Sequence, residues 1–410
     1  AWARLLEDHG TLGLADVFAP AIDLAQDGYV VGPRVAWDWQ KSAPRLAGNE
    51  AAARIFLPGG KAPRLGDTHR QPELAATLRA IGEGGRAAFY EGAIAEDIVG
   101  ALRGFGGLHT LDDFAAHESE YVEAIATNYR GLDIVQCPPN GQGLAALVML
   151  NILSGFDLAS LDPHGAKRFH LEAEAKRLAF RVRDALIADP AQAHVPVAEV
   201  LSASYADGLR SQIREDRAMT AEALSEVPVH PDTVFLTVVD RDRNVISFIN
   251  SLFFGFGSTI VAPKSGVVLH NRATGFVLTP GHPNCIAPRK RPMHTIIPGL
   301  AMEEGRAVMP FGVMGAHFQP TGHAHLLTNV VDFGMDPQEA LDSPRAFHDA
   351  GELVLESGIT EDVAAQLSAM GHSVVRGGPH GGGQVIQIDW QRGALLGASD
   401  PRKDGCALGY

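Results

Sequence analysis

The feature that most constrains the fold is an abrupt change of residue pattern near residue 230. Before it, apolar residues recur at helical spacing, as at Ile94, Ile98 and Leu102. After it come short β-rich runs, the first of which, 234–239, is apolar on both strand faces and therefore predicted to be covered on both sides. Helical spacing returns in 322–333 and 360–370. We expect an α/β fold, and specifically a four-layer αββα sandwich.

Local signals place several element boundaries. Pro72 is predicted to open a helix, Thr110 to cap one, and Gly371 to follow the end of another. A long helix with one buried stripe is predicted over 171–186. Further strands are predicted at the following places: 245–249, 259–261 and 266–269. The glycine-rich run 377–383 is predicted to be a flexible loop.

Composition limits the classes of function. With 410 residues and 46% hydrophobic residues, the chain can build a large core, and its length suggests two to three domains. A net charge of −14 argues against nucleic-acid binding and matches an anionic membrane surface poorly. The longest apolar stretch, 144–153, is too short to span a bilayer. We expect neither a nucleic-acid nor a membrane partner.

The cysteines and the first residues bear on the compartment. Cys137, Cys285 and Cys406 form no disulfide framework and no metal-binding spacing. This usage fits a reducing compartment and favours the cytoplasm over the periplasm. The chain begins inside a helical pattern and without methionine, so we expect that an N-terminal segment has been lost.

The junction itself suggests chemistry. His230, Pro231 and Asp232 lead directly into Thr233, the first residue of the predicted strand. A cut between Asp232 and Thr233 would give Thr233 a free α-amine beside its hydroxyl, so that one residue holds a nucleophile and a base. Threonine also starts many ordinary strands, and these residues alone leave both interpretations open.

Two glycine-rich turns, 254–258 and 311–316, could bring backbone N–H groups close to a reacting carbonyl, as an oxyanion hole requires. They could equally be ordinary turns. His317, His323 and His325, with His348 beyond, invite a metal interpretation, but residues i and i+2 of a helix do not share a face. No metal site is therefore predicted. The chain contains no GxSxG elbow, Walker A motif or GxGxxG.

Ordered motifs along the whole chain resemble the γ-glutamyltranspeptidase family of N-terminal-nucleophile hydrolases. Each motif is a short residue string that is typical of this family. The motifs lie at 18–25, 71–75, 89–92, 129–131, 232–233, 254–258, 290–292, 343–345 and 397–405. The resemblance implies a proenzyme that cleaves itself between Asp232 and Thr233. A large-subunit portion, 1–232 and mainly helical, and a small-subunit portion, 233–410, would then form one sandwich domain together. Two such heterodimers could pair into a homodimer.

The resemblance also implies site residues. Thr233 stands at the position of the nucleophile, Ser251 at that of a supporting hydroxyl, and Thr237 at that of a second hydroxyl on the same strand. Gly315 and Ala316 match the two consecutive glycines whose amides form the oxyanion hole. Alanine keeps its N–H, so this departure is mild. No cofactor is implied.

Departures from the family pattern concern the substrate. Gly275 replaces the acid that holds a glutamyl α-amine, and Arg272 replaces an amide or acidic residue. His294 and Thr295 replace a pair of serines, and with Asn271 and Arg272 they are expected to contact the substrate. The pattern looks most like the branch with oxamate amidohydrolase and related acylases. We therefore expect a small amide that bears a carboxylate, although Arg272 could instead pair with a structural acid.

The sequence therefore predicts a self-processing amidohydrolase or acyltransferase. Two alternatives remain open: a γ-glutamyltransferase or glutathione hydrolase, and an unprocessed, non-catalytic relative that binds small acids.

Overall fold

The structure, a computed structural model, describes residues 1–220 and 231–410. The chain forms two compact units. The first comprises 1–121 and 254–271, and the second comprises 122–253 and 272–410. Each unit contains residues from both sides of the junction near residue 232.

The first unit is mainly helical. Its helices and short strands are α1 (Trp2–His9), α2 (Leu14–Asp27), β1 (Tyr29–Val30), α3 (Pro33–Leu46), α4 (Glu50–Phe56), β2 (Thr68–His69), α5 (Pro72–Tyr90), α6 (Ala93–Gly104) and α7 (Leu111–Ala115). Pro72 occupies the first turn of α5, and the Thr110 hydroxyl caps α7 by accepting from the Asp113 amide, both as predicted. Ile94 and Ile98 of α6 are buried, which confirms that stripe as a core face.

The strands predicted at 259–261 and 266–269 do not form. Instead, an isolated antiparallel bridge pairs Val261 with Val268, and its two backbone bonds run from the Ala262 amide to Val267 O and from the Leu269 amide to Ile260 O. The pairing goes no further because Leu269 O accepts from the Ser258 amide and hydroxyl, while the Ile260 amide donates to Ser258 Oγ, so these groups are not available to a longer ladder.

The second unit is built on an antiparallel six-stranded sheet in the order β13-β12-β8-β7-β4-β3. Its strands are β3 (Ile125–Tyr129), β4 (Leu132–Gln136), β7 (Gly299–Glu303), β8 (Arg306–Met314), β12 (Gly382–Asp389) and β13 (Ala394–Ser399). A small sheet at one side has the order β11-β10-β9, with bounds β9 (Ala346–Asp349), β10 (Glu352–Leu355) and β11 (Val374–Arg376). The pair β5 (Pro231–Val239) and β6 (Val245–Phe254) forms a separate two-stranded sheet.

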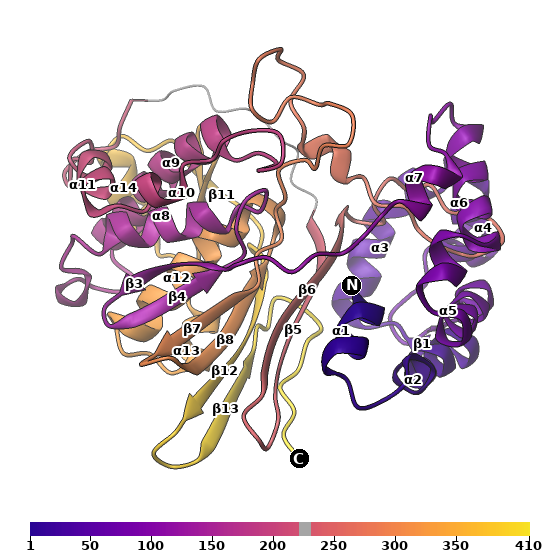
Figure 1. Cartoon of the computed structure of the whole chain (residues 1–410). Coiled ribbons are helices and arrows are strands. Elements are labelled where there is room, and N and C mark those ends of the chain that lie inside the picture. The colour runs from indigo at the N-terminus through magenta and orange to yellow at the C-terminus, as the bar shows by residue number, and fades with distance from the viewer. Residues whose placement is uncertain (221–230) are drawn as a thin grey trace. The chain divides into compact units, whose positions relative to one another are not determined.

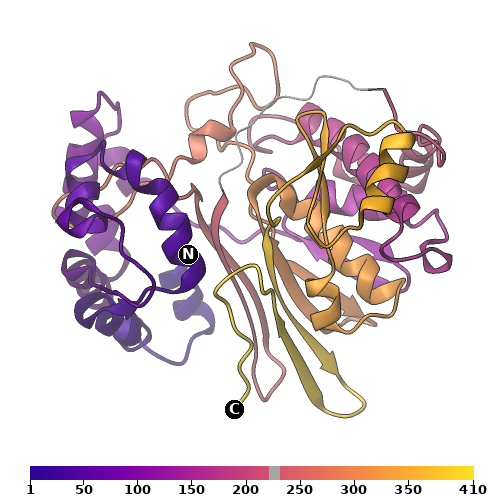
Figure 2. The same cartoon turned by 180° about the vertical axis from the view of Figure 1, so that it is seen from behind.

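The helices of the second unit are α8 (Gly143–Leu153), α9 (Ala166–Leu186), α10 (Val197–Val200), α11 (Ala203–Arg210), α12 (Gln319–Val331), α13 (Pro337–Asp342) and α14 (Glu361–Ala369). Of these, α8, α12 and α13 contact the large sheet, and α9 and α14 contact the small sheet. Figure 1 shows α8, α9 and α12 on one side of β7, β8 and β12, with β5 and β6 on the other. Figure 2 shows the same order from behind.

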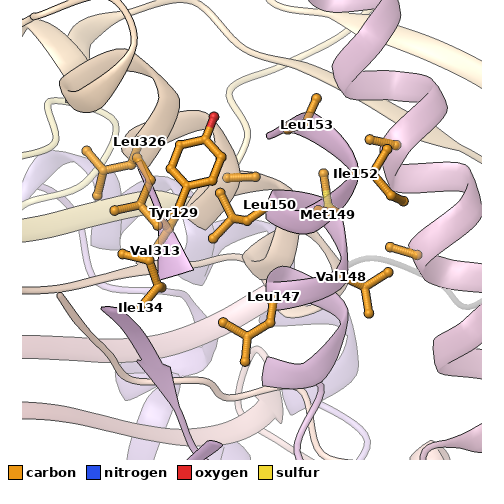
Figure 3. Close-up of a cluster of buried hydrophobic side chains, with 14 of the residues drawn as sticks. Tyr129, Ile134, Leu147, Val148, Met149, Leu150, Ile152, Leu153, Val313 and Leu326 are labelled. Carbon is orange, nitrogen blue, oxygen red and sulfur yellow. The ribbon is translucent and has the colours of Figure 1, made fainter. Parts of the chain in front are cut away.

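The core between sheet and helices centres on α8. This helix carries buried apolar residues around almost its whole circumference, and Figure 3 shows Leu147 and Leu150 close to Ile134 and Val313 of the sheet. The apolar stretch 144–153 is therefore a core helix. None of the described helices is both long and apolar enough to cross a membrane.

The strand β5 lies against β8 through one face only. Phe235 packs on Gly312, where a Cβ atom would come within 2.5 Å of the Phe235 ring. On the other face, Val234, Leu236 and Val238 are 63%, 40% and 46% exposed. The prediction that this strand is covered on both sides is therefore wrong in the described chain. The α/β class is confirmed, and the four-layer arrangement stays a prediction.

Two further expectations can be compared with the structure. The helices predicted at 322–333 and 360–370 correspond to α12 and α14, and Gly371 follows α14 with φ of 97°, as predicted. The run 377–383 is not a free loop over its whole length, because Gly382 and Gly383 begin β12 and pair with Met314 and Val313 of β8.

Candidate active site

Thr233 and Ser251 face each other from the paired strands β5 and β6. Their hydroxyl oxygens lie 3.1 Å apart. Ser251 Oγ also accepts a hydrogen bond of 2.9 Å from the Phe253 amide. Phe253 has φ of 81°, in the left-handed region that aromatic residues rarely adopt. This strained residue turns its amide back onto Ser251, which fixes the hydroxyl that contacts Thr233.

The turn after β8 presents two backbone amides. Gly315 and Ala316 have φ of 137° and 50°. In the described chain, no turn, loop or cap hydrogen bond uses either amide as its donor. A Cβ at Gly315 would lie 3.1 Å from Gly381 Cα, so glycine is needed there. The strand β5 contacts the short helix η4 (Ala316–Phe318), which brings this turn close to the strand of Thr233.

A buried glutamine holds this turn in place. Gln142 Nε2 donates to Ala316 O and to Thr295 O, each at 2.8 Å. Its Oε1 accepts from Arg183 Nη1 at 3.2 Å. Because arginine can only donate, this contact fixes which end of the amide faces which partner. Sequence reasoning missed both Gln142 and Arg183. The available signal was a polar residue just before a fully apolar helix.

Arg272 lies beside the same group of residues. Its Nη1 donates to Thr295 Oγ1 at 2.7 Å, and its guanidinium lies 4.5 Å from the centre of the Phe253 ring. Burial lowers the pKa of Arg272 to about 10. A Cβ at Gly275 would come within 2.6 Å of Met293 O, so an acidic residue could not replace Gly275 without moving the backbone.

The remaining predicted site residues lie in different parts of the structure. The His294 backbone bonds with Asn140 O and the Gln142 amide, each at 2.8 Å, which joins it to the segment before α8. Asn271 belongs to the first unit, where its Oδ1 accepts from the Phe254 amide at 3.1 Å. Thr237 is half-buried on β5. The side chain of Asp232 lies outside the described residues.

Two of the histidines considered as metal ligands, His323 and His325, each use a ring nitrogen in a separate hydrogen bond. His323 Nε2 accepts from the Val313 amide at 3.3 Å, and His325 Nδ1 accepts from Arg168 Nη1 at 2.7 Å. Burial lowers the pKa of His323 to about 3 and that of His325 to about 4. Both are neutral structural groups that do not converge on a common point.

In the part of the chain that the structure describes, one other group has metal-ligand composition. Ligand atoms of His170, Glu174 and His372 lie within 4.8 Å of one another. His170 Nδ1 is 2.8 Å from His372 Nε2, and its Nε2 bonds to Arg214 O. Glu174 accepts from Arg177 and from the Met219 amide. Each ligand atom already has a hydrogen-bond partner, so the cluster is a closed structural network.

The chain is similar to known proteins over its whole length. The model of the gamma-glutamyltranspeptidase family matches residues 1–410. The glutathione hydrolase-like YwrD proenzyme of Bacillus subtilis is 37% identical over all of this chain and 79% of its own length. The oxamate amidohydrolase proenzyme of Klebsiella pneumoniae is 32% identical over 97% of this chain and 76% of its own length. The solved cephalosporin acylase from Bacillus halodurans has a TM-score of 0.92 and 37% identity, and the match covers all of this chain and 77% of that one.

Proposed function

Because this chain belongs to the gamma-glutamyltranspeptidase family, we propose that Thr233 is the nucleophile through which it hydrolyses an amide bond. The family's proteins are hydrolases of the N-terminal-nucleophile type. Relatives of this chain are proenzymes, whose large and small subunits come from one precursor.

The observation that supports the proposal is the hydrogen bond of 3.1 Å between the Thr233 and Ser251 hydroxyls. It lies near a turn in which neither the Gly315 amide nor the Ala316 amide donates a turn or loop hydrogen bond within the described residues. After a cut between Asp232 and Thr233, the new α-amine would titrate at about pH 7.7–8.0 and could take the hydroxyl proton. Thr233 Oγ attacks the substrate carbonyl while the amides of Gly315 and Ala316 bind the oxyanion. The amine leaves with a proton, and water hydrolyses the ester.

The cut itself would use the same hydroxyl. Before cleavage the nitrogen of Thr233 is an amide and cannot act as the base. Thr233 Oγ attacks the Asp232 carbonyl, the bond to the Thr233 nitrogen breaks, and an ester forms. Water then opens the ester, which leaves a carboxylate on Asp232 and a free amine on Thr233.

For the substrate we favour a small amide with a carboxylate next to the scissile carbonyl, of which oxamate is the simplest. The buried cation of Arg272 favours a carboxylate, and the tight backbone at Gly275 leaves no room for an acid that would hold an α-amine. The expected contacts of the substrate with Asn271 and His294 belong to this proposal. Glutathione hydrolysis is the second candidate, because a 37% identical relative is named glutathione hydrolase-like.

A panel of amides tests the substrate. Wild type should hydrolyse oxamate with a higher kcat/KM than glutathione or a γ-glutamyl anilide. Arg272→Ala should raise KM for oxamate by about tenfold to a hundredfold, because a hydrogen bond to a charged group is lost. The KM for the neutral diamide oxamide should change much less. Faster turnover of the γ-glutamyl compounds, or equal effects of Arg272→Ala on both amides, would contradict this assignment and favour the second candidate.

A further inference from the structure

Next to the turn of Gly315 and Ala316, one buried side-chain nitrogen has no hydrogen-bond partner in the part of the chain that the structure describes. His317 directly follows Ala316 and is only 6% exposed. Its Nε2 is buried and meets no hydrogen-bonding atom in the described structure. Leaving a buried polar group without a partner is energetically costly, so such groups are rare and invite an explanation.

The tautomer of His317 follows from its other nitrogen. Nδ1 lies 3.0 Å from Arg183 Nη1, and because arginine can only donate, Nδ1 is the acceptor. Burial and then the charge of Arg183 hold the pKa of His317 well below its usual range, so the ring is neutral. A neutral ring with an accepting Nδ1 carries its hydrogen on Nε2. The atom without a partner is therefore an N–H donor.

The surroundings of the ring suit an anion. After burial, the nearby charges that lower the pKa of His317 are those of Arg183, Lys176 and Arg272, in that order. The His317 ring stands edge-on to the ring of Phe253, with 6.3 Å between centroids, and the Arg272 guanidinium lies over that same Phe253 ring. The Phe253 amide in turn binds Ser251, the partner of Thr233. His317 is thus linked through Phe253 both to the nucleophile pair and to Arg272.

We propose that His317 is a specificity residue whose Nε2–H binds a carboxylate oxygen on the acyl group of the substrate. This inference rests on the proposed function, and it names a second donor beside Arg272 for the same carboxylate. A carboxylate has two oxygens, so two separate donors, the Arg272 guanidinium and the His317 Nε2–H, would fix its orientation.

Two substitutions test the roles of the two His317 ring nitrogens separately. The Oδ1 atom of His317→Asn can replace Nδ1 as the acceptor for Arg183, but the variant lacks the far donor. The amide of His317→Gln can replace the far N–H donor. The measurement is the dissociation constant of oxalate, the dicarboxylate product, and of neutral oxamide, by calorimetry on the processed protein. His164→Asn is the control, because the His164 ring instead contacts Ser343 Oγ at 3.1 Å.

We expect His317→Asn to raise the dissociation constant of oxalate about tenfold to a hundredfold, and that of oxamide much less. His317→Gln should restore most of the oxalate affinity, and His164→Asn should leave it unchanged. Melting temperatures close to that of wild type would show that both variants fold. Equal losses of affinity for oxalate and oxamide, or no rescue by His317→Gln, would overturn the inference.

Failure of the inference and failure of the proposed function look different. Amide hydrolysis with oxalate binding that does not depend on His317 would overturn only the role of His317. Oxalate binding that depends on His317 in a protein without amidase activity would support the anion site and contradict the hydrolase.

Discussion

The turns 254–258 and 311–316 are similar in sequence and differ in what their backbone groups do. In the first, the amides of Gly257 and Ser258 donate to Phe254 O and Leu269 O, and Arg45 binds the carbonyls of Gly255 and Gly257. In the second, the carbonyl of Ala316 is held by Gln142, while the amides of Gly315 and Ala316 have no partner among the turns and loops of the described chain. Donor availability therefore separates a structural turn from a candidate oxyanion turn, and glycine content does not.

The largest expected effect comes from adding one methyl group to each turn. Gly315→Ala places a Cβ 3.1 Å from Gly381 Cα, so the turn must shift and its amides lose their alignment. We expect kcat to fall by about 10²–10³, the cost of losing an oxyanion donor. Gly257→Ala places a Cβ 2.4 Å from Leu269 O and should lower the melting temperature with little change in the kcat of the folded protein.

Steady-state kinetics and thermal unfolding of both variants check this prediction. A loss of kcat in Gly257→Ala as large as in Gly315→Ala would contradict the assignment of the first turn as structural and the second as a candidate oxyanion turn.

A smaller effect is expected from the side chains that bind the turn carbonyls. Gln142→Glu keeps the size of the side chain and an acceptor for Arg183, but it cannot donate to Ala316 O or Thr295 O. We expect kcat to fall about tenfold to a hundredfold, because the oxyanion turn loses its support. Arg45→Leu removes the corresponding contacts of the first turn and should lower stability by about 1 kcal/mol for each hydrogen bond, without a comparable loss of kcat.

Gln142→Asn serves as a second comparison, since it keeps the donor on a shorter side chain and should recover part of the activity. A Gln142→Glu variant with wild-type kcat would mean that Gln142 is not a positioning residue.

The smallest expected effect is a pH dependence of the protein's stability that comes from Lys176. Burial lowers the pKa of Lys176, on the same helix as Arg183, to about 7. Between pH 7 and about 10 the unfolded chain holds this proton while the folded chain releases it, so stability rises with pH. The expected slope is about 1 kcal/mol per pH unit. Urea unfolding of the Thr233→Ala chain at pH 7, 8 and 9 measures it, and Lys176→Met should flatten it. A slope that survives in Lys176→Met would refute the assignment to Lys176.

The sequence predicted local features well. Pro72, Thr110 and Gly371 mark helix ends because their chemistry acts within one turn. A strand at Thr233 and the contact of Thr233 with Ser251 were also expected, the contact only through the family resemblance. These features depend on neighbouring residues or on a pattern shared along the whole chain.

Contacts over long sequence separations could not be predicted. Gln142 and Arg183 reach a turn that lies far along the chain, and nothing near them in the sequence marks that partner. The exposed face of β5 was missed because an apolar pattern indicates what a strand can bury, and not what lies against it.

Intact-mass measurement of the purified protein tests most directly whether Thr233 becomes an N-terminal nucleophile. Wild type should give two fragments, the smaller beginning at Thr233, and Thr233→Ala should give one uncut chain without amidase activity. A wild-type protein that is active on amides as a single uncut polypeptide would contradict the proposed role of Thr233.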